Sequence, residues 1–178
     1  MTFRRLALLL FGFTTLGMAA GCAGPPADED ARRAWLTTKA SCGTYHYSVA
    51  TSSFTGRTSQ TTVQITNDVP TFRSFEASHF EQAAGSAAAD KVVDETWMEV
   101  GAEIGTHSEG APARTMEGLY DDCERDVLPR DPAKNEVTFE ADANGALQQC
   151  WYRPKYCADD CAMGVSVDDF ACGPISAP

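Results

Sequence analysis

The sequence predicts an α+β fold, in which an antiparallel sheet carries two helices packed on one face and is stapled by disulfides. Three observations support this prediction. Apolar and polar residues alternate in several short segments, as they do in strands that are buried on one face. Two other segments repeat apolar residues at helical spacing. Six cysteines follow residue 40 in a chain of 178 residues.

The two predicted helices have recognisable ends. The first covers residues 31–41 and uses Asp28 or Asp30 as its N-cap. The second begins after Thr115, its predicted N-cap, and ends before Pro129, because proline cannot continue a helix. Its apolar face repeats at a spacing of three to four residues through Met116, Leu119, Tyr120, Cys123 and Val127.

Alternation predicts the strands. Residues 44–50 place Tyr45, Tyr47 and Val49 on one face. The other predicted strands are residues 61–66, 69–77, 92–100, 136–141, 146–152 and 163–170.

Two connections and one ambiguity complete this prediction. The pair Asn67–Asp68 makes a hairpin turn, and the Ala-, Gly- and Ser-rich residues 78–90 form a flexible loop. Residues 92–100 also fit a helix, but Gly101 and Gly105 prevent a long one, so a strand is favoured.

Residues 1–21 have the layout of an export signal. Arg4 and Arg5 precede an apolar run, residues 6–13, and small residues follow up to Gly21. This run is shorter than the roughly 20 apolar residues that a bilayer crossing needs. The segment is therefore expected to be cleaved.

The end of this segment, Ala19-Ala20-Gly21-Cys22, resembles the lipobox of bacterial lipoproteins. The resemblance implies that Cys22 becomes the mature N-terminus, carries a diacylglyceryl and an N-acyl group, and anchors the protein in a membrane. Ala19 departs from the leucine that the lipobox prefers, so a secreted protein cut near Ala20 stays an alternative. Ala23, where an aspartate often signals inner-membrane retention, favours the outer membrane.

The predicted mature chain has one domain and is acidic. Residues 22–30 form a lipidated N-terminus and polar tether, and residues 31–178 form a single domain. Removing residues 1–21 leaves 12 of the 14 Lys and Arg residues and all 25 Asp and Glu residues, so the formal net charge is 12 minus 25, or −13. Such a surface repels nucleic acid, and no basic cluster offsets it.

Lipidation of Cys22 leaves an even set of six cysteines, which predicts three disulfides in an oxidising compartment. Cys157 and Cys161 are the expected local pair. A zinc site at these two residues is the rival interpretation, but no matching knuckle accompanies them. The other four are not paired by sequence reasoning, although Cys150 and Cys172 lie on segments expected to run antiparallel. The six are Cys42, Cys123, Cys150, Cys157, Cys161 and Cys172.

One segment imitates a calcium loop. Glu140, Asp142 and Asn144 stand at positions one, three and five of an EF-hand loop, and Gly145 stands at position six. The twelfth position, which needs a bidentate glutamate, holds Trp151. A hairpin turn with positive φ angles at Asn144 and Gly145 is therefore favoured.

Other polar residues give no stronger site. The histidines His46, His79 and His107 are isolated, and the pairs Asp159–Asp160 and Asp168–Asp169 are interpreted as solvated charge rather than as a divalent-cation or basic-partner site. No nucleophile elbow, phosphate loop or dinucleotide fingerprint is present. No catalytic residue, metal ligand or cofactor is predicted.

Two blocks of the chain resemble a bacterial family known as domain-of-unknown-function family 6174. The first runs from Trp35 through the Tyr-x-Tyr-x-Val strand to the hairpin that ends near Phe75. The second runs from Thr115 through the glycine turn at Gly145 to Phe170. The resemblance implies a small secreted or lipid-anchored domain and brings no activity. The chain departs from this family by a longer segment between the blocks, residues 78–113.

These observations predict a lipid-anchored protein of the cell envelope that acts as a binding or structural module for an envelope protein or glycan. The alternative is an inhibitor of a secreted enzyme, with residues 78–113 as its inhibitory loop.

Overall fold

The computed structural model describes residues 27–82 and 89–175. The predicted export signal, residues 1–21, and Cys22 lie outside the described residues. In the described part of the chain, neither helix has the length and apolar character that a membrane crossing requires.

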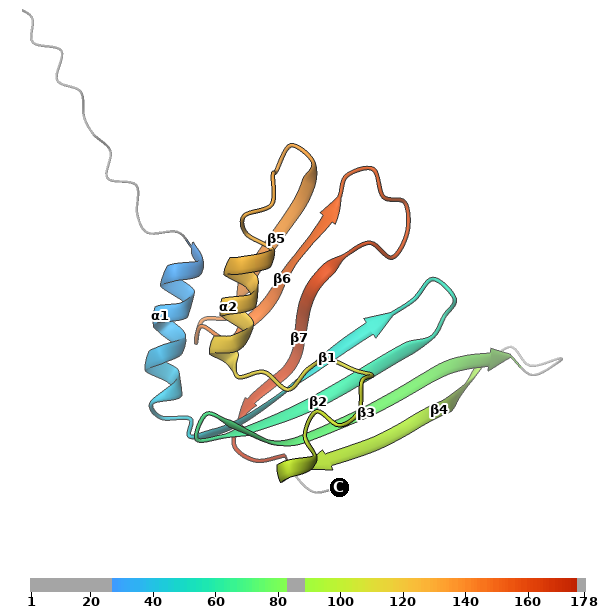
Figure 1. Cartoon of the computed structure of the whole chain (residues 1–178), viewed down its shortest axis with the longest axis horizontal. Coiled ribbons are helices and arrows are strands. Elements are labelled where there is room, and N and C mark those ends of the chain that lie inside the picture. The colour runs from blue at the N-terminus through green and yellow to red at the C-terminus, as the bar shows by residue number, and fades with distance from the viewer. Residues whose placement is uncertain (1–26, 83–88, 176–178) are drawn as a thin grey trace, which may run out of the picture.

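A single antiparallel sheet of seven strands forms the protein, in the order β4-β3-β2-β1-β7-β6-β5. It consists of two meanders that meet where β1 pairs with β7. Figure 1 shows that β5, β6 and β7 rise at a steep angle from the plane of the first four strands, so the sheet is folded over on itself. The strands are β1 (Thr44–Ser52), β2 (Thr58–Thr66), β3 (Val69–Gln82), β4 (Ala89–Val100), β5 (Asn135–Ala141), β6 (Leu147–Pro154) and β7 (Met163–Cys172).

Two helices cover one face of this sheet, as the sequence predicts. They are α1 (Ala27–Lys39) and α2 (Met116–Asp126), and both lie against the β5–β6–β7 part of the sheet (Figure 1). The 3-10 turn η1 (Gly101–Glu103) and a long connection lead from β4 to α2. The α+β prediction is therefore confirmed.

The alternation in β1 builds the core between sheet and helices. Trp35 of α1 packs edge-on against Tyr45, with ring centroids 5.1 Å apart, and both side chains are buried. The hydroxyl of Tyr45 accepts a hydrogen bond from the Met116 amide, and the hydroxyl of Tyr47 donates one to the Arg114 carbonyl. The two tyrosines thus position the start of α2, whose N-cap is Thr115 as predicted.

The turn between β5 and β6 contacts both helices. Gly145, with φ of +77°, approaches the backbone of Ala31 and Trp35 in α1 so closely that a Cβ would collide with them. Its carbonyl accepts a hydrogen bond from the buried hydroxyl of Tyr120 in α2. The adjacent carbonyl of Asn144 accepts one from Thr38. This turn therefore helps to hold α1 and α2 against the sheet.

Two predictions about irregular segments were wrong. Residues 78–90 are not a flexible loop over their described part, because β3 continues to Gln82 and β4 begins at Ala89, with a bulge after Ala77. The tether ends earlier than predicted, because Ala27 already belongs to α1. Asp28 and Asp30 lie in the first turn of this helix rather than at its N-cap, where they still complement the positive end of the helix dipole.

Other local predictions are confirmed. Asn67 and Asp68 have φ angles of 50° and 65°, as a two-residue hairpin turn requires. Residues 92–100 form the greater part of β4, and three strands close the chain.

Candidate functional site

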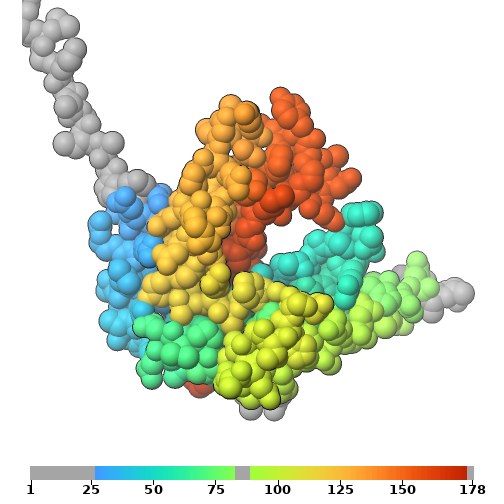
Figure 2. Space-filling model, viewed as in Figure 1, coloured from blue at the N-terminus to red at the C-terminus, as the bar shows by residue number. Residues whose placement is uncertain are grey.

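The folded-over sheet encloses a cleft of about 910 Å³. Figure 2 shows the hollow between β6–β7 on one side and the β1–β2 hairpin on the other. Its walls come from β1, the β1–β2 hairpin, α2, β6, β7 and the connection before α2. Ligand sites of proteins have volumes of roughly 300–1,000 Å³, so the cleft has the size of a binding site for a small molecule.

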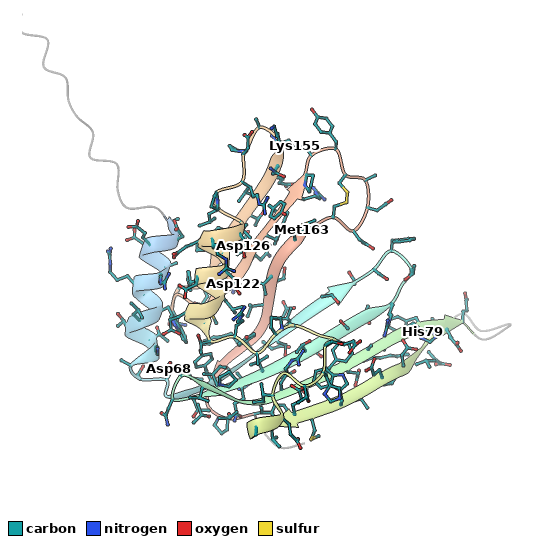
Figure 3. The ribbon with its side chains drawn as sticks, in the orientation of Figure 1. Asp68, His79, Asp122, Asp126, Lys155 and Met163 are labelled. Carbon is teal, nitrogen blue, oxygen red and sulfur yellow. A yellow bond between two sulfur atoms is a disulfide. The ribbon has the colours of Figure 1, made fainter. Side chains whose placement is uncertain are left out.

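The inner surface of the cleft is mainly apolar. Tyr47 and Val49 of β1 and Leu119 of α2 line it and are buried in the protein core. Val165 of β7 lines it as well and is partly buried. Met163, at the start of β7, also lines the cleft but is 52 % exposed, and Figure 3 shows it opposite α2. An accessible apolar side chain in a concave site is available to contact a ligand.

Charged side chains surround this apolar surface and form what we call the rim of the cleft. Positive and negative side chains are equal in number there. The cations are Arg57, Arg114, Arg125 and Arg130, and the acidic residues are Glu109, Asp122, Asp126 and Asp160. The chain as a whole has a formal net charge of −11. The formal charges around the cleft therefore cancel, although the protein as a whole is acidic.

Most of these acidic side chains have a partner on or near the cleft. Arg125 contacts Asp122 at 2.7 Å and Asp126 at 2.6 Å, and Arg114 contacts Asp122 at 3.2 Å. Hydrogen bonding to Arg125 lowers the pKa of Asp126, which is therefore ionised at neutral pH. Figure 3 shows Asp122 and Asp126 one turn apart on α2.

Arg130 has a different environment. Its guanidinium lies over the ring of Tyr152, with 4.4 Å between the Cζ atom and the ring centroid, and its Nε donates to the Asp126 carbonyl. Within the described part of the chain, no carboxylate lies within 4 Å of its side-chain nitrogens. The terminal nitrogens of Arg130 thus make no direct contact with a carboxylate of the described chain, although the Asp126 carboxylate is near enough to interact with Arg130 electrostatically.

The mouth of the cleft is bridged at one point. The backbone N–H of Phe54, in the β1–β2 hairpin, donates to Asp160 Oδ2 at 3.0 Å. Asp160 belongs to the β6–β7 loop, whose Cys157–Cys161 disulfide closes a short ring around it. The bridge joins two tips that are 106 residues apart in sequence.

A buried ion pair fixes the wall segment, which we define as residues 101–114. Arg73 of β3 lies 3.1 Å from Glu99 of β4, and the two side chains are 3 % and 1 % exposed. The Arg73 guanidinium donates to the carbonyls of His107, Glu109 and Ala111. Because Glu109 and Ala111 line the cleft, this ion pair sets the position of one of its walls.

The carboxylate of Glu99 holds the other half of the wall segment. It accepts hydrogen bonds from the amides of Gly105 and His107 and from the Nδ1 atom of His107. The His107 ring stacks on Trp97, with centroids 4.3 Å apart, and Arg73 lies over the same indole. His107, which appears isolated in the sequence, is therefore part of a structural cluster.

Sequence reasoning did not identify Arg73 and Glu99. Their positions in the strands could have indicated them. Arg73 stands two residues before Phe75 and Glu99 two residues after Trp97, so each shares the inward face of its strand with that aromatic residue. Opposite charges at inward positions of neighbouring strands indicate a buried pair. Of the predicted inhibitory segment, residues 78–82 and 89–100 belong to strands, and the wall segment is largely irregular backbone held by this ion pair.

The cysteines form the three predicted disulfides. Cys157 bonds to Cys161, which confirms the expected local pair. The four cysteines that sequence reasoning left unpaired form Cys42–Cys172 and Cys123–Cys150. The second of these ties α2 to β6 at the inner side of the cleft, since both of its cysteines line it.

The segment that imitates a calcium loop is a hairpin turn. The carboxylate of Asp142 accepts hydrogen bonds from the amides of Asn144 and Ala146, at 2.9 and 2.8 Å. Only Gly145 has the positive φ angle predicted for both turn residues. Glu140, which stands at position one of the imitated calcium loop, lies within β5.

The remaining polar candidates lie apart from one another. His46 contacts the Gly173 carbonyl, and His79 contacts Asp94 and Glu81 at the far end of β3 (Figure 3). Asp168 pairs with Ser48 across the β1–β7 seam. Asp159 is exposed beside Asp160 in the β6–β7 loop. Within residues 27–82 and 89–175, no group of three or more His, Cys, Asp or Glu side chains has the arrangement of a metal site.

We found no family model, no curated protein and no solved structure that matches this chain.

Proposed function

We propose that this protein is a lipid-anchored binding module of the cell envelope and that its cleft takes up a small, partly apolar ligand. The single observation that carries the binding role is the cleft of about 910 Å³, with its apolar inner surface and charged rim. The membrane anchor at Cys22 rests on the lipobox-like sequence alone. The sequence predicts an envelope protein or glycan as partner; the size of the cleft favours a ligand of small-molecule size instead.

The construction of the cleft supports a binding role over a purely structural one. The Cys123–Cys150 disulfide lines the cleft, and the Cys157–Cys161 disulfide closes the loop that carries the lining residue Asp160. A buried ion pair holds one of the cleft walls. A rigid, pre-formed site loses little conformational entropy when it binds its ligand. The solvent-accessible Met163 leaves apolar surface in the cleft that a ligand would cover.

Binding can be tested with a neutral fluorescent apolar dye, N-phenyl-1-naphthylamine. We expect saturable binding of one dye per protein, and Met163→Trp should weaken it by at least roughly tenfold, because the larger ring takes up the space beside β7 that the dye would use. Met98→Trp is the matched control, because Met98 is 67 % exposed on β4 and does not line the cleft. Absence of saturable binding, or equal weakening by the two variants, would contradict the proposal.

The anchor has its own test. Cys22→Ala should move the protein from the membrane fraction to the soluble fraction and abolish incorporation of labelled palmitate, since acyl chains supply the membrane affinity. Ala23→Ser, which leaves the lipobox-like residues intact, is the control. Density-gradient separation of the two membranes then tests the expected outer-membrane location. A Cys22→Ala protein that stays in the membrane fraction would contradict lipidation at this residue.

A further inference from the structure

We propose that the ligand of the cleft is an amphiphile with a hydrocarbon part and an anionic head group, a carboxylate or a phosphate monoester, and that Arg130 binds the head group. This inference rests on the proposed function, because it names the chemistry of the ligand that the cleft takes up.

We infer the negative charge of the head group from the rim side chains that already have partners within the protein. Asp122 and Asp126 contact Arg125, Asp160 accepts the Phe54 amide, and Glu109 accepts a hydrogen bond from Ser108. The acidic side chains of the rim are therefore supplied with donors by the protein. A cationic head group would have to compete with these donors.

The arginines of the rim differ in how closely they contact carboxylates of the protein. Arg114 and Arg125 contact carboxylates at 3.2 Å or less. Arg57 has its nearest carboxylate, that of Asp94, at 3.8 Å. Arg130 uses Nε for the Asp126 carbonyl, and in the described part of the chain no carboxylate contacts its terminal nitrogens. A guanidinium fork whose terminal nitrogens contact no carboxylate directly can bind a carboxylate or phosphate in bidentate geometry.

Arg130 is also held in place before a ligand arrives. Its stacking on Tyr152 and the Nε hydrogen bond fix the plane of the guanidinium. Tyr152 in turn contacts Met163, since its hydroxyl lies 2.9 Å from the sulfur. The Tyr152 ring thus contacts both the Arg130 guanidinium and the accessible Met163 side chain. A cationic group directly beside an apolar one suits an amphiphile at the point where its head group joins its hydrocarbon chain.

The test is displacement of N-phenyl-1-naphthylamine from the mature Cys22→Ala protein by decanoate, decyl phosphate and decanol. We expect the two anions to displace the dye at concentrations roughly tenfold lower than decanol, because a charge-assisted hydrogen bond adds to burial of the same chain. The comparison of decanoate with decyl phosphate distinguishes a fatty-acid source from a lipid-phosphate source.

Arg130→Gln should remove the advantage of the anions and leave displacement by decanol unchanged. Arg130→Lys, which keeps the charge but not the fork, should retain part of it. Arg153→Gln is the matched control, since Arg153 lies next to Tyr152 on β6, pairs with Glu136 and does not line the cleft. Urea unfolding of each variant shows that it is folded.

The outcomes separate the two proposals. Equal displacement by decanol and the anions in the unsubstituted protein would overturn the head-group inference while the binding function stands. An anion advantage that persists in Arg130→Gln would overturn the assignment to Arg130. Failure of the dye to bind at all would overturn the proposed function itself.

Discussion

Arg73 Nη1 and Glu99 Oε2 lie 3.1 Å apart inside the protein, and each side chain has almost no exposed surface. Removing one partner of a buried ion pair leaves the other charge uncompensated, which costs about 3–5 kcal/mol. We therefore expect Glu99→Gln to lower the free energy of unfolding by about this amount in urea titrations. Glu95→Gln, on the same strand but only half-buried, is the control. A loss of less than about 1 kcal/mol would show that the pair does not hold the wall segment.

The same carboxylate predicts a pH dependence. Burial alone would raise the pKa of Glu99, but hydrogen bonds from the amides of Gly105 and His107 and from the His107 and Arg73 side chains outweigh it. The pKa therefore lies well below the ordinary value of 4.5. The stability that this lowered pKa contributes is fully present above pH 4.5 and is lost as the pH falls toward the folded-state pKa. As the pH falls below 4.5, urea titrations should show that the free energy of unfolding decreases less in Glu99→Gln than in the unsubstituted protein. Equal decreases in the two proteins would show that the pH dependence does not come from Glu99.

Gly145→Ala should be far more damaging than another substitution at a positive φ angle. A Cβ at Gly145 would meet backbone atoms of Ala31 and Trp35, so α1 must move away from the sheet. We expect a loss of more than about 3 kcal/mol, comparable with large core disruptions. Gly56→Ala is the matched control, because Gly56 has a φ angle of +82° and open space around it, and it should cost only about 1 kcal/mol. Equal losses in urea titrations would mean that the turn does not carry α1.

The three disulfides should differ in their contribution to stability. They join cysteines 130, 27 and 4 residues apart. Loop-closure entropy then predicts losses of about 5, 3.5 and 2 kcal/mol when each pair is replaced by serine. Chemical unfolding of the three double variants tests this order, with Cys42 and Cys172 the most damaging pair. If the Cys157 and Cys161 variant were the least stable of the three, chain entropy would not explain the role of these bridges.

The bridge across the cleft mouth should be visible in hydrogen exchange. Asp160→Ala removes the acceptor of the Phe54 amide, so this amide should exchange faster while global stability changes by less than about 0.5 kcal/mol. Asp159→Ala, an equally small change in the same loop, is the control. Unchanged exchange at Phe54 in Asp160→Ala would show that the hairpin and the β6–β7 loop do not hold each other.

Local patterns predicted most of the secondary structure, because Tyr45, Tyr47 and Val49 alternate clearly and Thr115 is an effective N-cap. Residues 78–82 escaped prediction because Ser78, His79 and Phe80 show no apolar alternation, although pairing with β4 satisfies their backbone. The cleft has no local signal at all. It arises where the sheet folds over and where Arg73 and Glu99, 26 residues apart, hold the wall segment.

The pairing of β1 with β7 has a consequence for how the protein folds. Each meander joins strands that are close in sequence, but the seam between them joins residue 45 to residue 172. Chains are made from the N-terminus, so the first four strands are complete long before β7 exists. Until then the edge of β1 that will face β7 is unpaired, and at this edge the half-made chain can aggregate or be held by a chaperone. Contacts between such distant segments also slow folding, so formation of this seam is expected to be the slow step that completes the molecule.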